Sequence, residues 1–273
     1  MQALILVGGE GTRLRPLTET VPKAVMPLAG RPFLSYMIDW LRRHGVDDIV
    51  LACGFGADRL REVLGEGAEG QRVRFVSEPE PLGTAGAIKF AAAELGDRFL
   101  ALNGDVLTDL DLTALMAFHE QRDSSATLGL YPVQDTTGYG LVRRDGDGAI
   151  VEFLEKPDPS QAGPGEINAG TYVLERSVLD LIPDGQMVSI EREVFPRLIG
   201  KGLHALPLEG YWMDIGTPQR YLQATWDILE RRVETEIGSE LIRSSPRPRS
   251  RFRARSKRPR PPRPRPRGSP PRG

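Results

Sequence analysis

The chain begins with a short apolar run that leads directly into a glycine-rich loop. The run extends from Ala3 to Val7, and three glycines follow it within four positions, at Gly8, Gly9 and Gly11. A short apolar run that ends in glycine is typical of a buried strand in a parallel sheet. Because glycine has no Cβ, the N–H groups of such a loop can approach a ligand, and successive N–H groups bind anions. The sequence therefore predicts a phosphate-bearing ligand at the end of the first strand.

Two basic residues, Arg13 and Lys23, follow this loop and place fixed positive charge beside it. A nucleoside triphosphate would satisfy both the N–H groups and the cations. Two familiar phosphate loops are excluded. The pattern G-x-x-x-x-G-K-[ST] does not occur in the chain, and the dinucleotide pattern G-x-G-x-x-G requires glycine where Leu14 stands. The alternative interpretation is an ordinary strand-to-helix turn with surface cations.

The composition suits one large or two small globular domains, since 40% of the 273 residues are hydrophobic. The single cysteine, Cys53, excludes an intrachain disulfide and favours a reducing cytoplasm. The apolar runs are too short to cross a bilayer, and the N-terminus lacks the regions of a signal peptide. We therefore expect a cytoplasmic protein with no membrane partner. Three widely separated histidines, His44, His119 and His204, argue against a zinc site.

The formal net charge of −1 conceals two regions of opposite sign. Thirteen of the 36 basic residues and none of the 37 acidic residues lie between Arg243 and Gly273, so residues 1–242 carry 23 basic and 37 acidic residues. The basic stretch is rich in proline and cannot bury enough apolar surface to fold, so we expect a disordered tail over residues 238–273. Our hypothesis for this composition is a frameshifted or truncated C-terminus. The functional alternative is an arm that binds nucleic acid. The tail lacks the interleaved aromatic residues that would stack on bases, which argues against this alternative.

Strand and helix patterns alternate along the first half of the chain. Strands are predicted at residues 3–7, 48–52, 73–76 and 98–102, and helices at 32–44, 58–64 and 83–95. Later strands are predicted at 127–133, 140–144, 149–154, 168–174 and 203–207, with helices at 177–181, 191–199 and 218–231. The first pattern predicts an α/β fold whose parallel sheet carries helices on both faces, and the second predicts that the sheet becomes mixed. Active sites in such sheets lie beyond the carboxyl ends of the strands, where the glycine loop and Asp105 are expected.

The segment from Gly8 to Pro27 fills every position of the pattern G-G-x-G-T-R-L-x-P-x-T-x-x-x-P-K-x-x-x-P. It resembles the signature of the sugar-1-phosphate nucleotidylyltransferases. The resemblance covers residues 1 to about 237 and implies one Rossmann-like nucleotide-diphospho-sugar transferase domain with a mixed, mainly parallel sheet. It also implies that a sugar 1-phosphate attacks the α-phosphorus of a nucleoside triphosphate, so that pyrophosphate leaves. These two substrates are the expected partners, and self-association into a homo-oligomer stays open.

The resemblance assigns roles to residues on the nucleotide side. Arg13 would grip the β- and γ-phosphates, and Lys23 would bridge the α-phosphate and the incoming phosphate. Asp105 and Asp214 would hold Mg²⁺, the expected cofactor, although each aspartate alone could be a cap or loop residue. The residues expected to contact the nucleotide are Leu6, Gly8, Gly9, Gly11, Thr12, Glu78, Gly83 and Thr84.

Two of these assignments have plainer alternatives. Gly83 would let a flat base approach the backbone, and the helix that begins there would add N-terminal N–H donors. The plainer interpretation is an ordinary helix start with Thr84 as its cap. Asp109 and Asp111 form a D-x-D string that could suggest a glycosyltransferase metal site, but we favour Asp111 as the cap of the next helix.

The sugar side follows from three further motifs. Glu155 and Lys156, in E-K-P, would bind the sugar hydroxyls and the sugar phosphate. Asn168 and Gly170, in N-A-G, belong to the sugar motif, and Gly140 would let the backbone approach the sugar ring. Read alone, a Glu-Lys pair at a strand end is more often a solvated surface pair.

The base and the sugar are harder to choose than the reaction. The strings E-P-L-G-T-A-G-A and G-D-V-L-T-D-L look most like those of mannose-1-phosphate guanylyltransferases. GTP and mannose 1-phosphate are therefore the expected substrates, and glucose-1-phosphate thymidylyl- or uridylyltransferases remain the alternative. A different class, a catalytically silent nucleotide-sugar sensor, should have lost Arg13, Lys23, Asp105 or Asp214, and all four are present.

Overall fold

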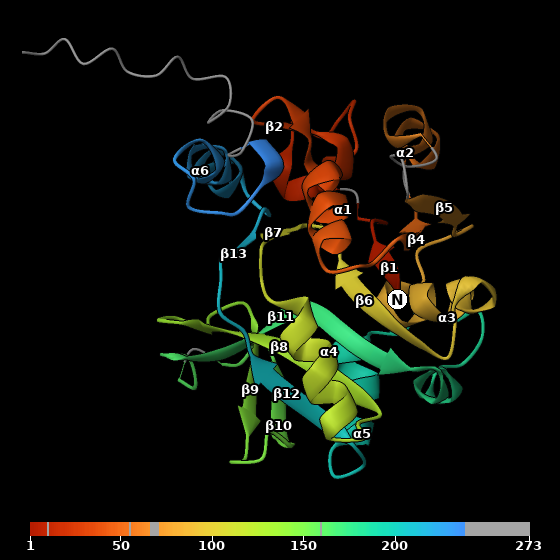
Figure 1. The fold of residues 1–273 in the computed structure, drawn as a ribbon, viewed down its shortest axis with the longest axis vertical. Coiled ribbons are helices and arrows are strands. Elements are labelled where there is room, and N and C mark those ends of the chain that lie inside the picture. Colours follow the sequence, from red (N-terminus) through yellow and green to blue (C-terminus); the bar gives the residue numbers. More distant parts are fainter. Residues whose placement is uncertain (10, 55, 66–70, 159, 238–273) are drawn as a thin grey trace, which may run out of the picture.

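The computed structural model describes residues 1–9, 11–54, 56–65, 71–158 and 160–237. The tail predicted at 238–273 lies outside these residues. Within them, nine strands form one sheet in the order β10-β9-β11-β6-β1-β4-β5, and β8 and β12 extend it from β11 (Figure 1). The strands are β1 (Gln2–Leu6), β4 (Asp48–Cys53), β5 (Arg72–Ser77), β6 (Arg98–Asn103), β8 (Ala126–Val133), β9 (Gly140–Arg144), β10 (Ile150–Glu155), β11 (Gly165–Glu175) and β12 (Leu203–Pro207).

The sheet is mixed and mainly parallel, as predicted. The pairs β1–β4, β1–β6, β4–β5 and β8–β12 are parallel. The pairs that β11 forms with β6, β8 and β9, and the pair β9–β10, are antiparallel. Among the described strands of this sheet, β10 and β11 therefore run against the other seven.

Helices cover both faces of the sheet. They are α1 (Phe33–Arg43), α2 (Ala57–Leu64), α3 (Gly83–Phe90), α4 (Leu112–Gln121), α5 (Phe195–Leu198) and α6 (Pro218–Leu229). Successive strand residues point to opposite faces, so in β1 the side chain of Leu4 packs with α3 and α5, whereas Ala3 and Ile5 pack with α1 and α4. In Figure 1, α4 crosses in front of β8 and β12. Burial on both faces explains why the first strand is an uninterrupted apolar run.

A third, smaller core lies outside the main sheet. It joins α6 to two short two-stranded pairs, β2 (Pro27–Leu28) with β3 (Arg31–Pro32), and β7 (Val106–Thr108) with β13 (Trp212–Asp214). Ile215 and Leu107 are buried at its centre. This core carries the segment around residue 214 to the edge of the sheet where β6 ends.

Three predicted helices differ in kind or continuity from the observed elements. The helix expected over 83–95 ends at Phe90 and continues as a 3₁₀ turn, Ala91–Glu94. The helix expected over 177–181 is a 3₁₀ helix, Arg176–Leu181. The helix expected over 191–199 divides into a π-helical turn, Ile190–Val194, and the short α5. Pro196 lies where these two parts meet and lacks the N–H that a continuous α-helix would use.

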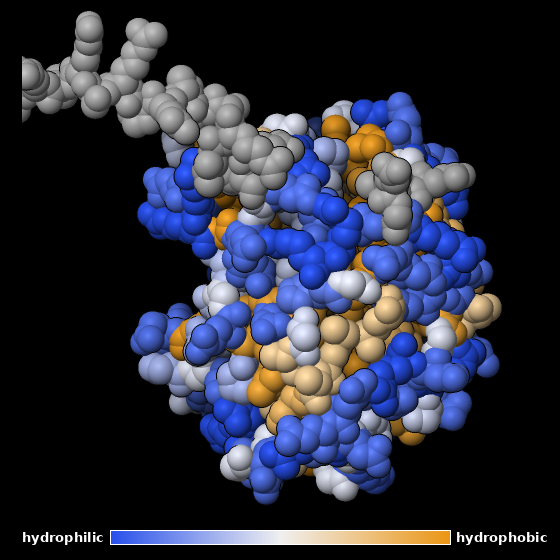
Figure 2. Space-filling view, viewed as in Figure 1, coloured by the Kyte–Doolittle hydropathy of each residue, from blue (hydrophilic) through white to orange (hydrophobic). Residues whose placement is uncertain are grey.

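None of the described helices is both long and apolar enough to cross a membrane. The face drawn in Figure 2 is mostly hydrophilic, with paler apolar side chains gathered where α4 lies in Figure 1. The outline of this face is indented beside β13, between α6 and the strands β9 and β10 (Figure 2).

Candidate active site

A cavity of about 760 Å³ lies at the carboxyl ends of β1, β4 and β6. This is the edge of the sheet at which the glycine loop and Asp105 were expected together. Most of the residues predicted to bind the nucleotide line this cavity. They are Leu6, Gly8, Gly9, Gly11, Thr12, Arg13, Lys23, Glu78, Gly83, Thr84 and Asp105. The five sugar-side residues and Asp214 are not among its lining residues.

The glycines of the loop differ in what surrounds them. Gly11 has a φ of +63°, and a Cβ there would lie 3.0 Å from Cγ2 of Thr18. Thr18 is buried and donates a hydrogen bond to the Gly11 carbonyl at 2.8 Å. Gly9, in contrast, has no atom within 4 Å of the place where its Cβ would be. Gly11 therefore shapes the loop, whereas Gly9 leaves its backbone open to the cavity.

The two predicted metal ligands are brought together by the pairing of β7 with β13. Val106, next to Asp105, lies opposite Asp214 in this antiparallel pair. The N–H of Ile215, which follows Asp214, donates to the Asp105 carbonyl at 2.9 Å. Sequence reasoning predicted the aspartates but missed both strands, because three-residue strands carry no usable periodicity.

Each of these carboxylates is paired with a cation. Lys23 Nζ lies 3.0 Å from Oδ2 of Asp105, and Arg220 Nη1 lies 3.1 Å from Oδ2 of Asp214. Burial, with the nearby Asp105 carboxylate, raises the pKa of Asp214, and Lys23, Arg220 and Arg13 act in the opposite direction. Several cations and two close carboxylates thus share one small region of the site.

The aspartate pair fits a divalent cation. Oδ1 of Asp214 is buried, and no donor among the described residues reaches it. A buried carboxylate oxygen without a partner is costly, and a bound cation would satisfy it. No group of three or more His, Cys, Asp or Glu side chains in the described part of the chain could hold a metal. Mg²⁺ is commonly bound by one or two carboxylates together with substrate phosphates, which is what Asp105 and Asp214 could offer.

Arg13 approaches this pair across a glycine. A Cβ on Gly216 would lie 2.8 Å from Nη2 of Arg13 and 3.0 Å from Oδ1 of Asp214. A side chain at this position would require the end of the Arg13 side chain to move. Gly216 and Arg220 are both missing from the predicted site. The W-M-D-I-G-T-P string contains the glycine, but its partner Arg13 is two hundred residues away.

The sugar-side residues form a separate cluster on β9, β10 and β11. Gly140 and Glu155 lie opposite each other in the β9–β10 pair. A Cβ on Gly140 would lie 2.8 Å from Oε2 of Glu155 and 3.4 Å from Cβ of Asn168. Burial, and then the Glu191 carboxylate, raise the pKa of Glu155, so this carboxyl group is unlike a solvated surface acid. The structure therefore brings together Gly140, Glu155 and Asn168, as the resemblance implied.

Two further residues connect this cluster to its surroundings. Gly170 has a φ of +69°, and a Cβ there would lie 2.6 Å from Nδ2 of Asn103, which lines the cavity. Lys156 is exposed and has a φ of 56°, which is uncommon for a residue with a side chain. Its N–H donates to the Tyr139 carbonyl at 3.2 Å.

An aromatic group that sequence reasoning missed lies beside these residues. The ring of Trp212 stacks on Tyr131 at 5.6 Å and meets the edge of Tyr139 at the same distance. The indole N–H donates to the Ala169 carbonyl at 2.9 Å. The Arg220 guanidinium lies 5.4 Å from the centre of the Tyr139 ring, so this cation contacts both the aromatic group and Asp214.

The start of α3 corrects one interpretation and narrows another. Leu82, not Thr84, stands at the N-cap position, and no side chain caps the helix. The Thr84 hydroxyl instead donates to Glu191 and accepts the N–H of Ile190. The Val188 carbonyl accepts the N–H groups of Ala85 and Gly86, and those two helix donors are therefore occupied.

Gly83 also has a structural reason to be glycine. Its φ is +71°, and a Cβ would lie 2.6 Å from the Val188 carbonyl oxygen. The close approach of this carbonyl therefore requires glycine whether or not a base lies nearby.

The D-x-D string has a structural role. Asp111 caps α4 by accepting the N–H of Ala114 at 3.0 Å, as predicted. Oδ1 and Oδ2 of Asp109 accept the N–H groups of Tyr211 and Glu234. Both side chains thus bind backbone N–H groups, which argues against a metal site at this string.

Known proteins resemble this chain over most of its length. The chain is 39% identical over 234 residues to a mannose-1-phosphate guanylyltransferase of Mycobacterium tuberculosis, which covers 84% of this chain and 65% of that protein. It is 41% identical over 232 residues to a mannose-1-phosphate guanyltransferase of Yarrowia lipolytica, covering 82% of this chain and 63% of that one. The chain thus spans a little less than two thirds of the length of these relatives.

One similar solved structure is covered over almost its whole length. The crystal structure of HddC from Yersinia pseudotuberculosis complexed with GMP-PN has a TM-score of 0.71 and 31% sequence identity, covering 83% of this chain and 99% of that chain. The family model described as nucleotidyl transferase matches residues 2–231. This match includes the glycine loop, both aspartates and the sugar-side cluster, and the chain belongs to the nucleotidyl transferase family.

Proposed function

We propose that this protein transfers a guanylyl group from GTP to mannose 1-phosphate, forming GDP-mannose and pyrophosphate. The observation that carries the reaction is the β7–β13 pairing, which joins Asp105 and Asp214 at a cavity lined by the glycine loop, Arg13 and Lys23. The choice of GTP and mannose 1-phosphate is supported by the names of the two relatives and by the GMP-PN complex of HddC.

The chemistry requires alignment and charge neutralisation. A phosphate oxygen of the sugar 1-phosphate forms a bond to the α-phosphorus, and the bond from that phosphorus to the bridging oxygen of pyrophosphate breaks. The nucleophile is already an anion, so no general base is needed. Bound by Asp105 and Asp214, Mg²⁺ would neutralise charge on the triphosphate.

The cations of the chain would share this neutralisation. Lys23 would contact the α-phosphate and the incoming phosphate, and Arg13 would contact the departing pyrophosphate. Lys23 is held by its ion pair with Asp105, and the Arg13 guanidinium lies beside Gly216, near enough to Asp214 to oppose the rise in the pKa of that carboxyl group. Cations that are already oriented stabilise a developing charge without reorganisation during the reaction.

The sugar would bind at the β9–β11 cluster. Glu155 would accept hydrogen bonds from sugar hydroxyls, Asn168 would add an amide, and the exposed Lys156 would pair with the sugar phosphate. Without a Cβ, Gly140 leaves room for the Glu155 carboxylate to lie over the strand beside Asn168. A reaction that consumes a nucleoside triphosphate would take place in the cytoplasm, which is the location we propose.

Pyrophosphate release in the presence of Mg²⁺ tests the proposal. Five nucleoside triphosphates are each paired with mannose 1-phosphate and with glucose 1-phosphate. We expect the highest kcat/KM for GTP with mannose 1-phosphate. A preference for dTTP or UTP with glucose 1-phosphate would keep the reaction and replace the substrates, and no turnover with any pair would contradict the proposed activity.

A further inference from the structure

A chain of hydrogen bonds connects the nucleotide cavity to the sugar-side cluster through Glu191. Oε2 of Glu191 accepts from the hydroxyls of Thr84 at 2.8 Å and Ser189 at 2.7 Å. Oε1 accepts from the Tyr172 hydroxyl at 3.5 Å. The Tyr172 oxygen in turn accepts from Nδ2 of Asn168 at 2.8 Å. Thr84 lines the cavity, and Asn168 lies beside Gly140, so the chain spans both parts of the site.

A carboxylate at Glu191 and the N–H of Gly170, at the two ends of this series of hydrogen bonds, favour the same direction for the bonds between them. An ionised carboxylate can only accept hydrogen bonds, so the Tyr172 hydroxyl must direct its hydrogen towards Glu191. The Tyr172 oxygen is then left to accept, and the amide nitrogen of Asn168 must face it. The amide oxygen of Asn168 then faces the N–H of Gly170, at 3.0 Å, and this backbone donor favours the same orientation. The second N–H of the Asn168 amide takes no part in these hydrogen bonds and can donate to a ligand.

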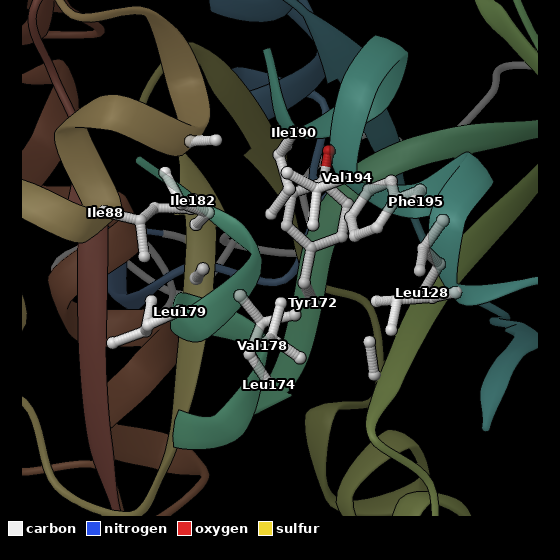
Figure 3. Packing of buried hydrophobic residues seen from close by; sticks show 14 of the residues in the cluster. Ile88, Leu128, Tyr172, Leu174, Val178, Leu179, Ile182, Ile190, Val194 and Phe195 are labelled. Carbon is white, nitrogen blue, oxygen red and sulfur yellow. The ribbon is translucent and has the colours of Figure 1, made fainter. Parts of the chain in front are cut away.

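The middle of this series of hydrogen bonds, at Tyr172, is shielded from water. Tyr172 is fully buried, and its ring packs among Ile190, Val194 and Phe195, with the hydroxyl oxygen at the end of the ring towards Ile190 and Val194 (Figure 3). Burial raises the pKa of Tyr172 well above its usual value, so the hydroxyl keeps its proton. No water can therefore substitute for a missing partner here without rearrangement of the core.

Glu191 itself stands in the π-helical turn Ile190–Val194. Such turns are rare and occur frequently at functional sites. Ser189 caps this turn by accepting the N–H of Arg192 at 3.3 Å, and Ser189 also donates to Glu191. The turn thus places one carboxylate within reach of α3 on one side and β11 on the other.

We propose that Glu191 is a positioning residue that, through Tyr172, secures the orientation in which Asn168 presents an N–H donor to the sugar. This inference rests on the proposed function, because it assumes that a sugar 1-phosphate binds beside Asn168. Glu191 does not need to touch the sugar. Its negative charge orients the amide from two hydrogen bonds away, and the same charge holds the wall of the nucleotide cavity at Thr84.

The decisive variant is Glu191→Gln, which keeps the shape but gives the side chain N–H donors. The Tyr172 hydroxyl can then accept from Gln and direct its hydrogen towards Nδ2 of Asn168, so the amide either loses this acceptor or turns over against the N–H of Gly170. We expect KM for mannose 1-phosphate to rise about tenfold and KM for GTP to change less than twofold. The matched control is Glu193→Gln in the same turn, an exposed residue whose Oε1 accepts the N–H of Ser189. This control should leave both KM values unchanged.

A second variant keeps the inference testable if Glu191→Gln does not fold. Tyr172→Phe removes only the hydroxyl that links Glu191 to Asn168. It should raise KM for mannose 1-phosphate to a similar extent, and the double variant should be no worse than the more affected single variant, because both changes break one chain. Additive effects, or an unchanged KM in a folded Glu191→Gln protein that turns over, would overturn the inference.

A measurement without substrates separates this inference from the proposed function. Side-chain amide resonances of Asn168 should show one N–H protected from exchange in the wild type and in Glu193→Gln. That protection should be lost in Glu191→Gln and in Tyr172→Phe. Unchanged protection would overturn the positioning role even if no substrate pair gave turnover, whereas lost protection in an inactive protein would contradict only the proposed function.

Discussion

The two halves of the active site are built in different ways. The nucleotide half uses a glycine loop, whose open positions such as Gly9 expose the backbone directly to the cavity. The sugar half uses side chains from β9, β10 and β11, and their orientation depends on partners such as Tyr172 and Glu191. A loop of consecutive residues can be recognised in a sequence. A network of side chains from separate elements can be identified only once those elements are packed.

The β7–β13 pair belongs to neither half and joins them. It contributes one aspartate from the end of β6 and one from just before α6. Its six residues form a very short sheet, yet they decide where charge is concentrated. Loss of this junction should therefore have a larger effect than loss of either half.

Removal of the Asp214 charge, at the β7–β13 pair, is expected to have the largest effect on activity. Asp214→Asn should lower Mg²⁺-dependent kcat by about 10³-fold or more, because the buried oxygen available for the cation loses its charge. The domain should stay folded, since the carboxylate is already disfavoured by burial and by Asp105. Pyrophosphate release, Mn²⁺ binding and thermal unfolding would be measured together.

Asp111→Asn is the matched control for that substitution. Asparagine is an equally good helix cap, so α4 should be retained. Full activity is expected. A loss of metal-dependent turnover in this control, with full activity in Asp214→Asn, would return the D-x-D string as the metal site.

Loss of a cation from the nucleotide half should have the next largest effect. Arg13→Gln should reduce kcat by about 10²- to 10³-fold with a smaller change in KM for GTP, because the guanidinium is expected to act on the departing pyrophosphate. Arg59→Gln, on the exposed surface of α2, is the control, and its activity should be unchanged. An equal rise in KM with unchanged kcat would show that Arg13 binds only the ground state.

Substitutions at Gly83 and Gly9 compare a glycine that the fold requires with one whose backbone faces the cavity. Gly83→Ala should destabilise the protein by about 1 to 3 kcal/mol, since its Cβ meets the Val188 carbonyl at a positive φ. Gly9→Ala should leave the unfolding temperature unchanged and raise KM for GTP about tenfold, as one N–H contact to phosphate is hindered. Unfolding curves and steady-state kinetics of both variants test this contrast, and a reversed pattern would show that the roles are exchanged.

The smallest effect concerns pH at the sugar half. The pKa of Glu155 is raised by burial, so its charge is lost at a higher pH than that of an ordinary glutamate. KM for mannose 1-phosphate should rise a few-fold as pH falls through this pKa. For stability the sign is opposite: ionisation of Glu155 costs more in the folded protein than in the unfolded chain. Wild-type stability relative to Glu155→Gln should therefore fall as pH rises from the usual glutamate range through the raised pKa.

Paired measurements of KM and unfolding temperature between pH 4 and 7 would test both statements. Glu152→Gln, an exposed position on the same strand, controls for general effects of charge. A KM profile that stays flat in the wild type would contradict the assignment of Glu155 to the sugar.

The sequence predicted regular elements best where the apolar pattern was long. The bounds of β9 and β12 match the predicted ones, and β1, β4, β5 and β6 differ by one residue at an end or two. Short elements were missed, because β7 and β13 are stabilised by each other and by the α6 core rather than by their own composition. The alternative interpretation of Thr84 as a helix cap was wrong for a similar reason, since the partner of its hydroxyl, Glu191, is 107 residues away.

The sequence by itself determined the parallel framework, the glycine loop and the family. Each depends on residues that are neighbours in the chain, and local spacing is enough to specify them. Tertiary structure alone decided that Asp105 meets Asp214, that Gly216 admits Arg13, and that Glu191 orients Asn168. These contacts depend on distance and burial, and both are set only when remote segments pack into one core.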